Sequence, residues 1–264
     1  MVVEFDIRTP DSARKFISEL TGMTEQEYNV EIIDNIDRFE LLWDKLFERI
    51  QTIDISDLRI IAFHIVGSLD ECKEIEKNGL MNLRKVLSNN TFLGKELKKV
   101  GVKVDIENKV VSCNDKSYML SGKSSGKLFL VSNRLLNDYC VNGFLCNDDV
   151  FSYGDDICKR PEFLKNISEL FPEIHTLEEF WKRKSKSYRI NFYATLNQIS
   201  KGIFDICNAD DSLSDDMKIK KSLLWYALNR ALDNFGTEKF IYIKPDLSIP
   251  SEQIISIDEL NYTE

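Results

Sequence analysis

The chain has few of the residues that build a zinc site, and no C-x-x-C pair. Its 264 residues include two histidines and six scattered cysteines. We therefore expect reduced structural thiols and no metal. Long apolar runs are also missing, since no stretch approaches the ~20 residues of a membrane helix. The first residues lack the basic start and apolar core of a signal peptide, which predicts a cytoplasmic location.

Two segments look like ligand-binding motifs but lack residues that those motifs need. Residues 121–126, Ser-Gly-Lys-Ser-Ser-Gly, contain the Gly-Lys-Ser of a phosphate-binding loop without its first glycine. We predict a flexible loop there. The aspartate pairs at 148–149 and 155–156 lack the alternating pattern and the final glutamate of a calcium loop, so solvated carboxylates are expected.

Negative charge is concentrated at the N-terminus. Residues 1–57 contain 14 acidic and 6 basic side chains, a net charge of −8 out of −9 for the whole chain. Thr24 and Glu27 form a capping-box signature, and apolar residues at helical spacing predict one long amphipathic helix from there to about Thr52. Residues 1–57 are therefore interpreted as an acidic helical arm, which either braces the rest of the chain or docks a partner protein.

Two basic clusters lie in the nearly neutral remainder. The first extends from Arg84 to Lys103 and the second from Lys182 to Arg189. Such clusters attract a polyanion such as RNA or DNA. They are also typical of solvated helix faces, and the sequence leaves both interpretations open.

The most informative stretch is residues 58–80. Residues 58–66 are mostly apolar and β-branched, which predicts a buried strand with His64 near its end. Ser68, with a glutamate three residues later, is typical of a helix N-terminus, so a helix is expected over 68–78. Gly79 is expected to be its left-handed C-cap.

This order of strand, turn, helix and glycine resembles the first motif of the ADP-ribosyltransferase fold. The matching residues are His64, Ile65, Ile75, Gly79 and Leu80. DarT-type enzymes have a threonine where this chain has Val66. The resemblance implies that His64 binds a ribose hydroxyl of NAD and that Ile65 contacts the nicotinamide amide through its backbone. A core histidine at a strand end is the non-functional interpretation.

A second resemblance lies near the C-terminus. Glu238 precedes an apolar strand expected over 239–244, and a further apolar run follows at 249–257. This arrangement is similar to the catalytic-glutamate region of His-Tyr-Glu-type bacterial ADP-ribosyltransferases. It implies that Glu238 stabilises the positive charge on the ribose as nicotinamide leaves. The alternative is a solvated glutamate before an edge strand.

The resemblance also implies an aromatic residue that stacks on nicotinamide. Tyr153 is favoured because it lies in an irregular, glycine-containing segment expected over 142–160, with Tyr139 and Tyr118 as alternatives. Arginine-directed relatives have a glutamate where this chain has Gly236, which disfavours a protein-arginine acceptor.

The expected fold is α+β. Residues 58–264 would form a split mixed or antiparallel sheet of the ADP-ribosyltransferase type, next to the N-terminal helical arm. Further strands are predicted as a three-stranded meander over 102–120, and at 127–131 and 188–196.

The resemblance implies an NAD-dependent ADP-ribosyltransferase that needs no metal and modifies a macromolecule, with nucleic acid favoured over protein. Analogy with stand-alone transferases indicates a toxin or antiviral effector. One alternative is a catalytically degenerate fold that binds a partner. The other is an NAD-dependent RNA 2′-phosphotransferase-like enzyme, whose site would need a second histidine besides His64. The sequence offers only His175, in an expected loop.

Overall fold

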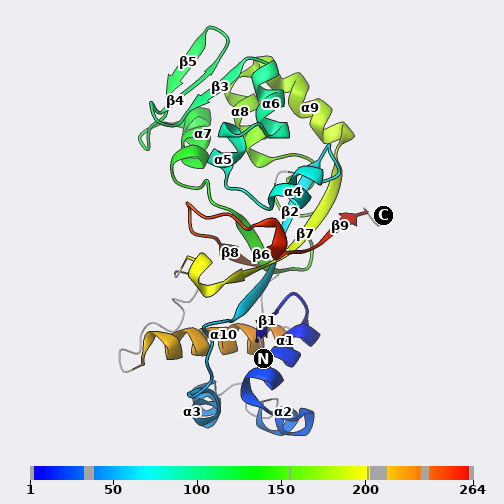
Figure 1. Cartoon of the computed structure of the whole chain (residues 1–264), viewed down its shortest axis with the longest axis vertical. Coiled ribbons are helices and arrows are strands. Elements are labelled where there is room, and N and C mark those ends of the chain that lie inside the picture. The colour runs from blue at the N-terminus through cyan, green and yellow to red at the C-terminus, as the bar shows by residue number, and fades with distance from the viewer. Residues whose placement is uncertain are drawn as a thin grey trace. The chain divides into compact units, whose positions relative to one another are not determined.

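The computed structural model describes residues 3–32, 39–154, 156–200, 202, 213–232 and 238–261, which form an α+β fold (Figure 1). The helices are α1 (Pro10–Thr21), α2 (Glu25–Glu31), α3 (Phe39–Ile50), α4 (Lys73–Asn78), α5 (Leu83–Ser88), α6 (Phe92–Lys99), α7 (Gly126–Leu136), α8 (Glu162–Leu170), α9 (His175–Lys184) and α10 (Asp215–Ala231). The strands are β1 (Glu4–Phe5), β2 (Arg59–Ser68), β3 (Val102–Asp105), β4 (Val110–Cys113), β5 (Lys116–Met119), β6 (Asn142–Asn147), β7 (Lys186–Thr195), β8 (Glu238–Tyr242) and β9 (Ile254–Leu260).

The strands form two sheets among the described residues. The larger sheet has the order β8-β6-β2-β7-β9, with β1 parallel to β2 and β7 antiparallel to β9. The smaller sheet is the antiparallel meander β3-β4-β5. The predicted α+β class, the meander and the strands containing His64 and following Glu238 are confirmed.

By their internal contacts the residues fall into two compact units. Unit 1 contains 1–62, 144–148 and 193–241, and unit 2 contains the other three stretches, 63–143, 149–192 and 242–264. This division differs from the expected boundary after residue 57, because the N-terminal helices share unit 1 with α10. The physical reason is that α1 buries its apolar face and packs along α10.

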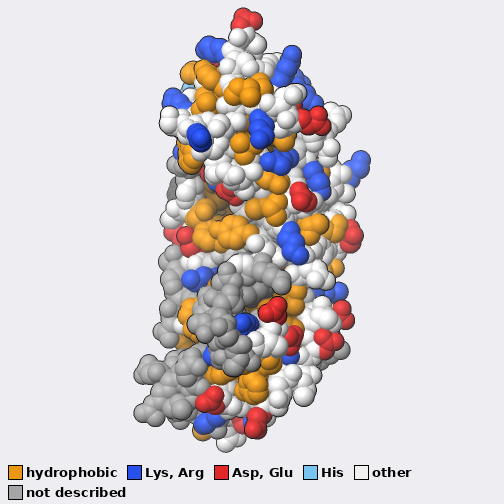
Figure 2. Space-filling view, turned by 90° about the vertical axis from the view of Figure 1, so that its left-hand side faces the viewer, with side chains coloured by type: hydrophobic (Ala, Val, Ile, Leu, Met, Phe, Trp, Pro, Cys, Tyr) orange, Lys and Arg blue, Asp and Glu red, His pale blue; other side chains and the backbone are white. Residues whose placement is uncertain are grey.

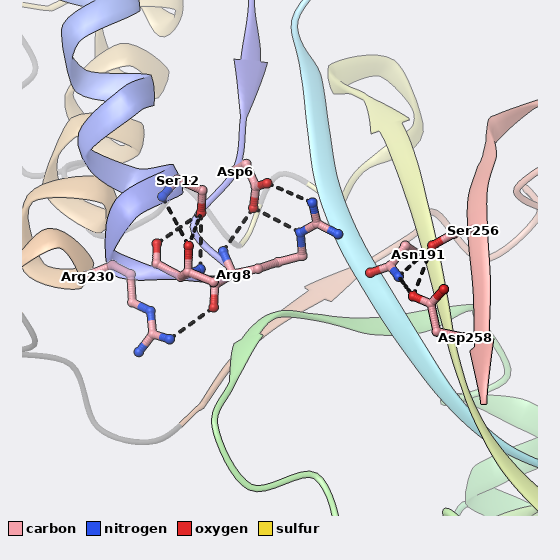
Figure 3. Close-up of polar contacts among 8 residues, drawn as sticks. Asp6, Arg8, Ser12, Asn191, Arg230, Ser256 and Asp258 are labelled. Carbon is pink, nitrogen blue, oxygen red and sulfur yellow. Dashed lines mark hydrogen bonds and ion pairs between the residues drawn. The ribbon is translucent and has the colours of Figure 1, made fainter. Parts of the chain in front are cut away.

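A buried arginine organises part of unit 1. Arg230, near the end of α10, forms an ion pair with Asp148 at 2.6 Å and donates from Nη2 to the carbonyl oxygen of Arg8 at 3.0 Å. The side chain of Arg8 in turn pairs with Asp6 at 2.8 Å (Figure 3). These contacts join α10 and the end of β6 to the connection between β1 and α1.

The single helix expected up to Thr52 differs from the observed elements. Thr24 caps α2 in the predicted capping box with Glu27. The chain then has α2 and α3 as separate elements, and residues 33–38 between them lie outside the described residues. The predicted apolar face is confirmed for α3, the second of these helices. Its residues Leu42, Trp43, Leu46 and Ile50 are all buried.

The core of unit 2 forms between helices α5 to α9 and the meander. Its largest buried side chains include Phe163, Phe171 and Trp181. The strand predicted over 127–131 is wrong, since these residues belong to α7. Val131 and Leu135 lie four positions apart and are both fully buried in this core, which requires helical spacing.

Two more predictions near the candidate site need correction. The helix expected over 68–78 begins only at Lys73, because Ser68 is still in β2 and its Oγ accepts from the Cys72 backbone N–H at 2.9 Å. The C-cap Gly79 has the expected positive φ of 73°, but its ψ of −167° is not left-handed helical. The segment expected to be irregular over 142–160 begins with β6, five of whose six residues are buried.

Gly67 allows a close backbone approach in unit 2. A Cβ atom at this position would lie 2.3 Å from the carbonyl carbon of Lys159 and 2.6 Å from the backbone nitrogen of Arg160. The Gly67 carbonyl oxygen also accepts from Trp181 Nε1 at 2.8 Å. We therefore expect Gly67→Ala to lower the free energy of unfolding by about 3 kcal/mol. Urea denaturation measures this, with Gly122→Ala as control because no atom lies within 4 Å of its added Cβ. Equal effects of the two substitutions would contradict it.

Candidate functional site

His64 lies in the second half of β2 and is half-buried. Its Nδ1 lies 2.8 Å from the carbonyl oxygen of Asn142, the first residue of β6. A carbonyl oxygen only accepts, so Nδ1 must carry the proton. In the neutral ring Nε2 is then a hydrogen-bond acceptor. Burial lowers the pKa of His64 below its ordinary value of 6.5 and so favours the neutral ring. The hydrogen bond to Asn142 has a smaller, opposing effect on this pKa.

Asn142 is itself held by a polar network. Its Nδ2 donates to Asp138 Oδ1 at 3.1 Å, and the Cys140 thiol donates to its Oδ1 at 2.9 Å. Asp138 Oδ2 accepts from Arg134 Nη1 at 2.5 Å, and the same guanidinium pairs with Glu162 of α8. All of these residues belong to unit 2. We call Arg134, Asp138, Cys140, Asn142 and Glu162 the His64 support network.

Two tyrosines interact electrostatically with charged residues of this network. Tyr153, half-buried in the turns after β6, interacts with the charge of Arg134. Tyr242, at the end of β8, is 42% exposed. Burial raises the pKa of Tyr242, and the negative charge of Asp138 adds to the effect. Tyr153, predicted from the sequence, and Tyr242, which was not, are therefore both near the groups that hold His64.

The side chain of Ile65 faces the protein interior. It is 4% exposed, so only its backbone is suited to the predicted contact with an amide. That contact stays a prediction.

Glu238 is the first residue of β8 and belongs to unit 1. Its Oε2 accepts a hydrogen bond from Nδ2 of Asn147, the last residue of β6, at 3.3 Å. Gly236 lies outside the described residues. Because His64 belongs to unit 2, its convergence with Glu238 on one NAD pocket stays a prediction.

Sequence reasoning missed the residues of β6. Asn142 contacts His64 and Asn147 contacts Glu238, yet neither asparagine belongs to a recognised motif. One signal was available, because the two asparagines flank the short run Gly-Phe-Leu-Cys. Amides at both ends of a buried strand need partners, which marks them as candidates for positioning other polar groups.

Some cations of the first basic cluster bind other residues of the protein. Arg84 donates to the carbonyl oxygen of Leu135 at 2.7 Å and stacks on Tyr139, and Lys85 donates to Ser248 at 3.1 Å. The remaining lysines of α6 and β3 are exposed. Those without an ion pair to any described residue are Lys95, Lys98 and Lys103.

The second basic cluster has the same mixed character. Lys182 pairs with Asp156 at 3.7 Å and Lys186 with Glu259 at 2.9 Å. Arg183 and Lys184, at the end of α9, are exposed and have no ion pair within the described part of the chain. On the face in Figure 2, Lys and Arg side chains are spread among hydrophobic ones rather than gathered in one patch.

Other candidate sites have little support. In the described ranges, no three His, Cys, Asp or Glu side chains gather as they would around a metal ion, and none of the helices described is long and apolar enough to cross a membrane. Residues 121–125 lie in the connection between β5 and α7, whereas Gly126, predicted to be in the loop, is the first residue of α7. The sequence lacks the first glycine that a phosphate-binding loop needs. His175 is not in a loop but begins α9, and its side chain is 65% exposed.

Comparisons with protein-family models, with curated proteins and with solved structures find no match to this chain. The ADP-ribosyltransferase resemblance therefore rests on the residues of the sequence alone.

The lowered pKa of His64 predicts a pH dependence of stability. The folded protein binds this proton less tightly than the unfolded chain, whose histidine has the ordinary pKa of 6.5. We expect the contribution of His64 to be fully present above that pH and to decrease as the pH falls towards the folded-state pKa. Urea midpoints between about pH 7.5 and 5.5 measure this, and His64→Gln should remove part of the dependence. An identical pH profile in the variant would contradict the prediction.

Proposed function

We propose that the chain is an NAD-dependent ADP-ribosyltransferase that modifies a macromolecule. The sequence resemblance supplies the activity, and one observation in the structure supports it. The Nδ1 of His64 lies 2.8 Å from the Asn142 carbonyl oxygen and must donate to it, and burial favours the neutral ring by lowering the pKa of His64. Its Nε2 is then suited to accept a hydrogen bond from a ribose hydroxyl.

The proposed reaction breaks the bond between ribose C1′ and the nicotinamide nitrogen. The electron pair leaves with nicotinamide, and the ribose becomes positively charged before a nucleophile of the acceptor bonds to C1′ and loses a proton. In this proposal the Glu238 carboxylate stabilises the positive ribose, while His64 and the backbone of Ile65 bind NAD. Tyr153 stacks on nicotinamide.

For the acceptor we propose nucleic acid. The exposed side chains of the two basic clusters without an ion pair to the described residues support this, because they are available to phosphate groups. They are Lys95, Lys98, Lys103, Arg183 and Lys184. A cytoplasmic toxin or antiviral effector is the role that such an activity would fit.

The assay uses NAD labelled in its adenylate part, purified protein and a cell extract. We expect release of nicotinamide and a labelled macromolecule that nuclease, but not protease, converts to small fragments. Protease-sensitive label would move the proposal to a protein acceptor. Phosphate transferred from RNA to NAD would favour the RNA 2′-phosphotransferase, and a calorimetric titration without NAD affinity would favour a degenerate fold that binds a partner.

A further inference from the structure

The accepting carbonyl beside His64 belongs to the peptide group between Asn142 and Gly143. Asn142 and Gly143 are the first two residues of β6, so the pairing of this strand in the larger sheet helps to hold the peptide. The side chain of Asn142 lies where the strand begins, and the groups that bind it add a second constraint.

The side chain of Asn142 is held on both sides. A carboxylate only accepts, so the amide nitrogen must face Asp138, at 3.1 Å, and the amide oxygen must then face the Cys140 thiol, at 2.9 Å. Burial raises the pKa of Cys140, and the charge of Asp138 adds to this effect, which keeps the thiol protonated and able to donate. Both ends of the amide therefore have a defined partner.

Asp138 is in turn fixed to two helices. Its other oxygen accepts from Arg134, one turn earlier at the end of α7, and Arg134 also pairs with Glu162 of α8. The backbone N–H of Asp138 donates to the carbonyl oxygen of Asn133 at 2.9 Å. The side chains of Arg134 and Asp138 are only 23% and 32% exposed, so solvent competes weakly for these bonds.

We propose that Asn142 and Asp138 are positioning residues that hold His64 as its Nδ1–H tautomer and so leave Nε2 as an acceptor. That this acceptor binds a ribose hydroxyl rests on the proposed function. The assignment of the tautomer does not depend on the proposed function. At metal sites, a carbonyl or carboxylate that accepts a hydrogen bond from one ring nitrogen fixes the histidine tautomer in the same way.

The test is nitrogen-15 NMR of the imidazole in a His175→Gln background, where His64 is the only histidine. We expect nitrogen shifts of one Nδ1–H tautomer and slow exchange of that proton. Asn142→Ala and Asp138→Ala should each speed this exchange about tenfold and populate the Nε2–H tautomer. Asp138→Asn keeps an acceptor oxygen for Asn142 and should retain most of the wild-type signal.

Asp115→Ala is the control, because this carboxylate is exposed in a turn and has no side-chain hydrogen bond or ion pair to the described residues. Thermal unfolding shows whether each variant is folded. A folded Asn142→Ala or Asp138→Ala protein with an unchanged tautomer and exchange rate would overturn the proposal. Should one variant fail to fold, the other still decides it.

The outcome is separable from that of the proposed function. A fixed tautomer in a protein without NAD affinity would leave the positioning roles intact and refute the transferase. Where NAD is cleaved, Asn142→Ala should raise the KM for NAD about tenfold and change kcat less, because His64 is proposed to bind the substrate rather than react with it.

Discussion

Glu238→Gln is expected to lower the rate of nicotinamide release from NAD about a hundredfold or more. The substitution keeps the size of the side chain and removes its negative charge. In the proposed reaction this charge stabilises the ribose only when nicotinamide departs, so its loss acts mainly on kcat. The contact with Asn147 Nδ2, 3.3 Å from Glu238 Oε2, can be kept by the glutamine oxygen, and the fold should be unaffected.

The matched control is Glu252→Gln, which makes the same change at an exposed carboxylate without a partner among the described residues. It should keep full activity. Asn147→Ala should give an intermediate loss, because Glu238 keeps its charge but loses a hydrogen-bond donor that orients it. Unchanged turnover in Glu238→Gln would remove the catalytic assignment of this residue.

Glu178→Leu is expected to destabilise the protein by about 3–5 kcal/mol, the usual cost of breaking a buried ion pair. Glu178 Oε1 lies 2.6 Å from Arg160 Nε, and the exposed fractions of the two side chains are 7% and 5%. The other carboxylate oxygen accepts from Ser168. The substitution withdraws the charge that compensates Arg160 inside unit 2. Urea denaturation by circular dichroism measures the loss.

Glu179→Leu is the control one position later. Glu179 is 52% exposed and lies 3.7 Å from Lys182, so removing it should change stability by only about 0.5 kcal/mol. The double variant Arg160→Met, Glu178→Leu should regain part of the loss, because no buried charge of the pair then remains. If Glu178→Leu is as harmless as Glu179→Leu, the ion pair contributes little.

The same pair predicts sensitivity to acid. Burial raises the pKa of Glu178, but the hydrogen bonds from Ser168 and Arg160 outweigh it and hold the pKa below the ordinary value of 4.5. The stabilisation is therefore present above about pH 4.5 and is lost as the pH falls through the folded-state pKa.

Local chemistry explains the predictions that succeeded. The Thr24 capping box, the positive φ at Gly79 and the meander are set by residues within a few positions of one another. The strand predicted over 127–131 failed for the opposite reason. A short apolar run fits a strand or a buried helix, and only the core around Val131 and Leu135 decides between them.

The sequence by itself determined the α+β class, the strand that contains His64 and the existence of a strand next to Glu238. Only the tertiary structure decided what those side chains contact. Asn142 lies 78 positions from His64, and Asn147 lies 91 positions from Glu238. Hydrogen bonds over such separations depend on which strands become neighbours in the sheet, and no local preference of the chain encodes that order.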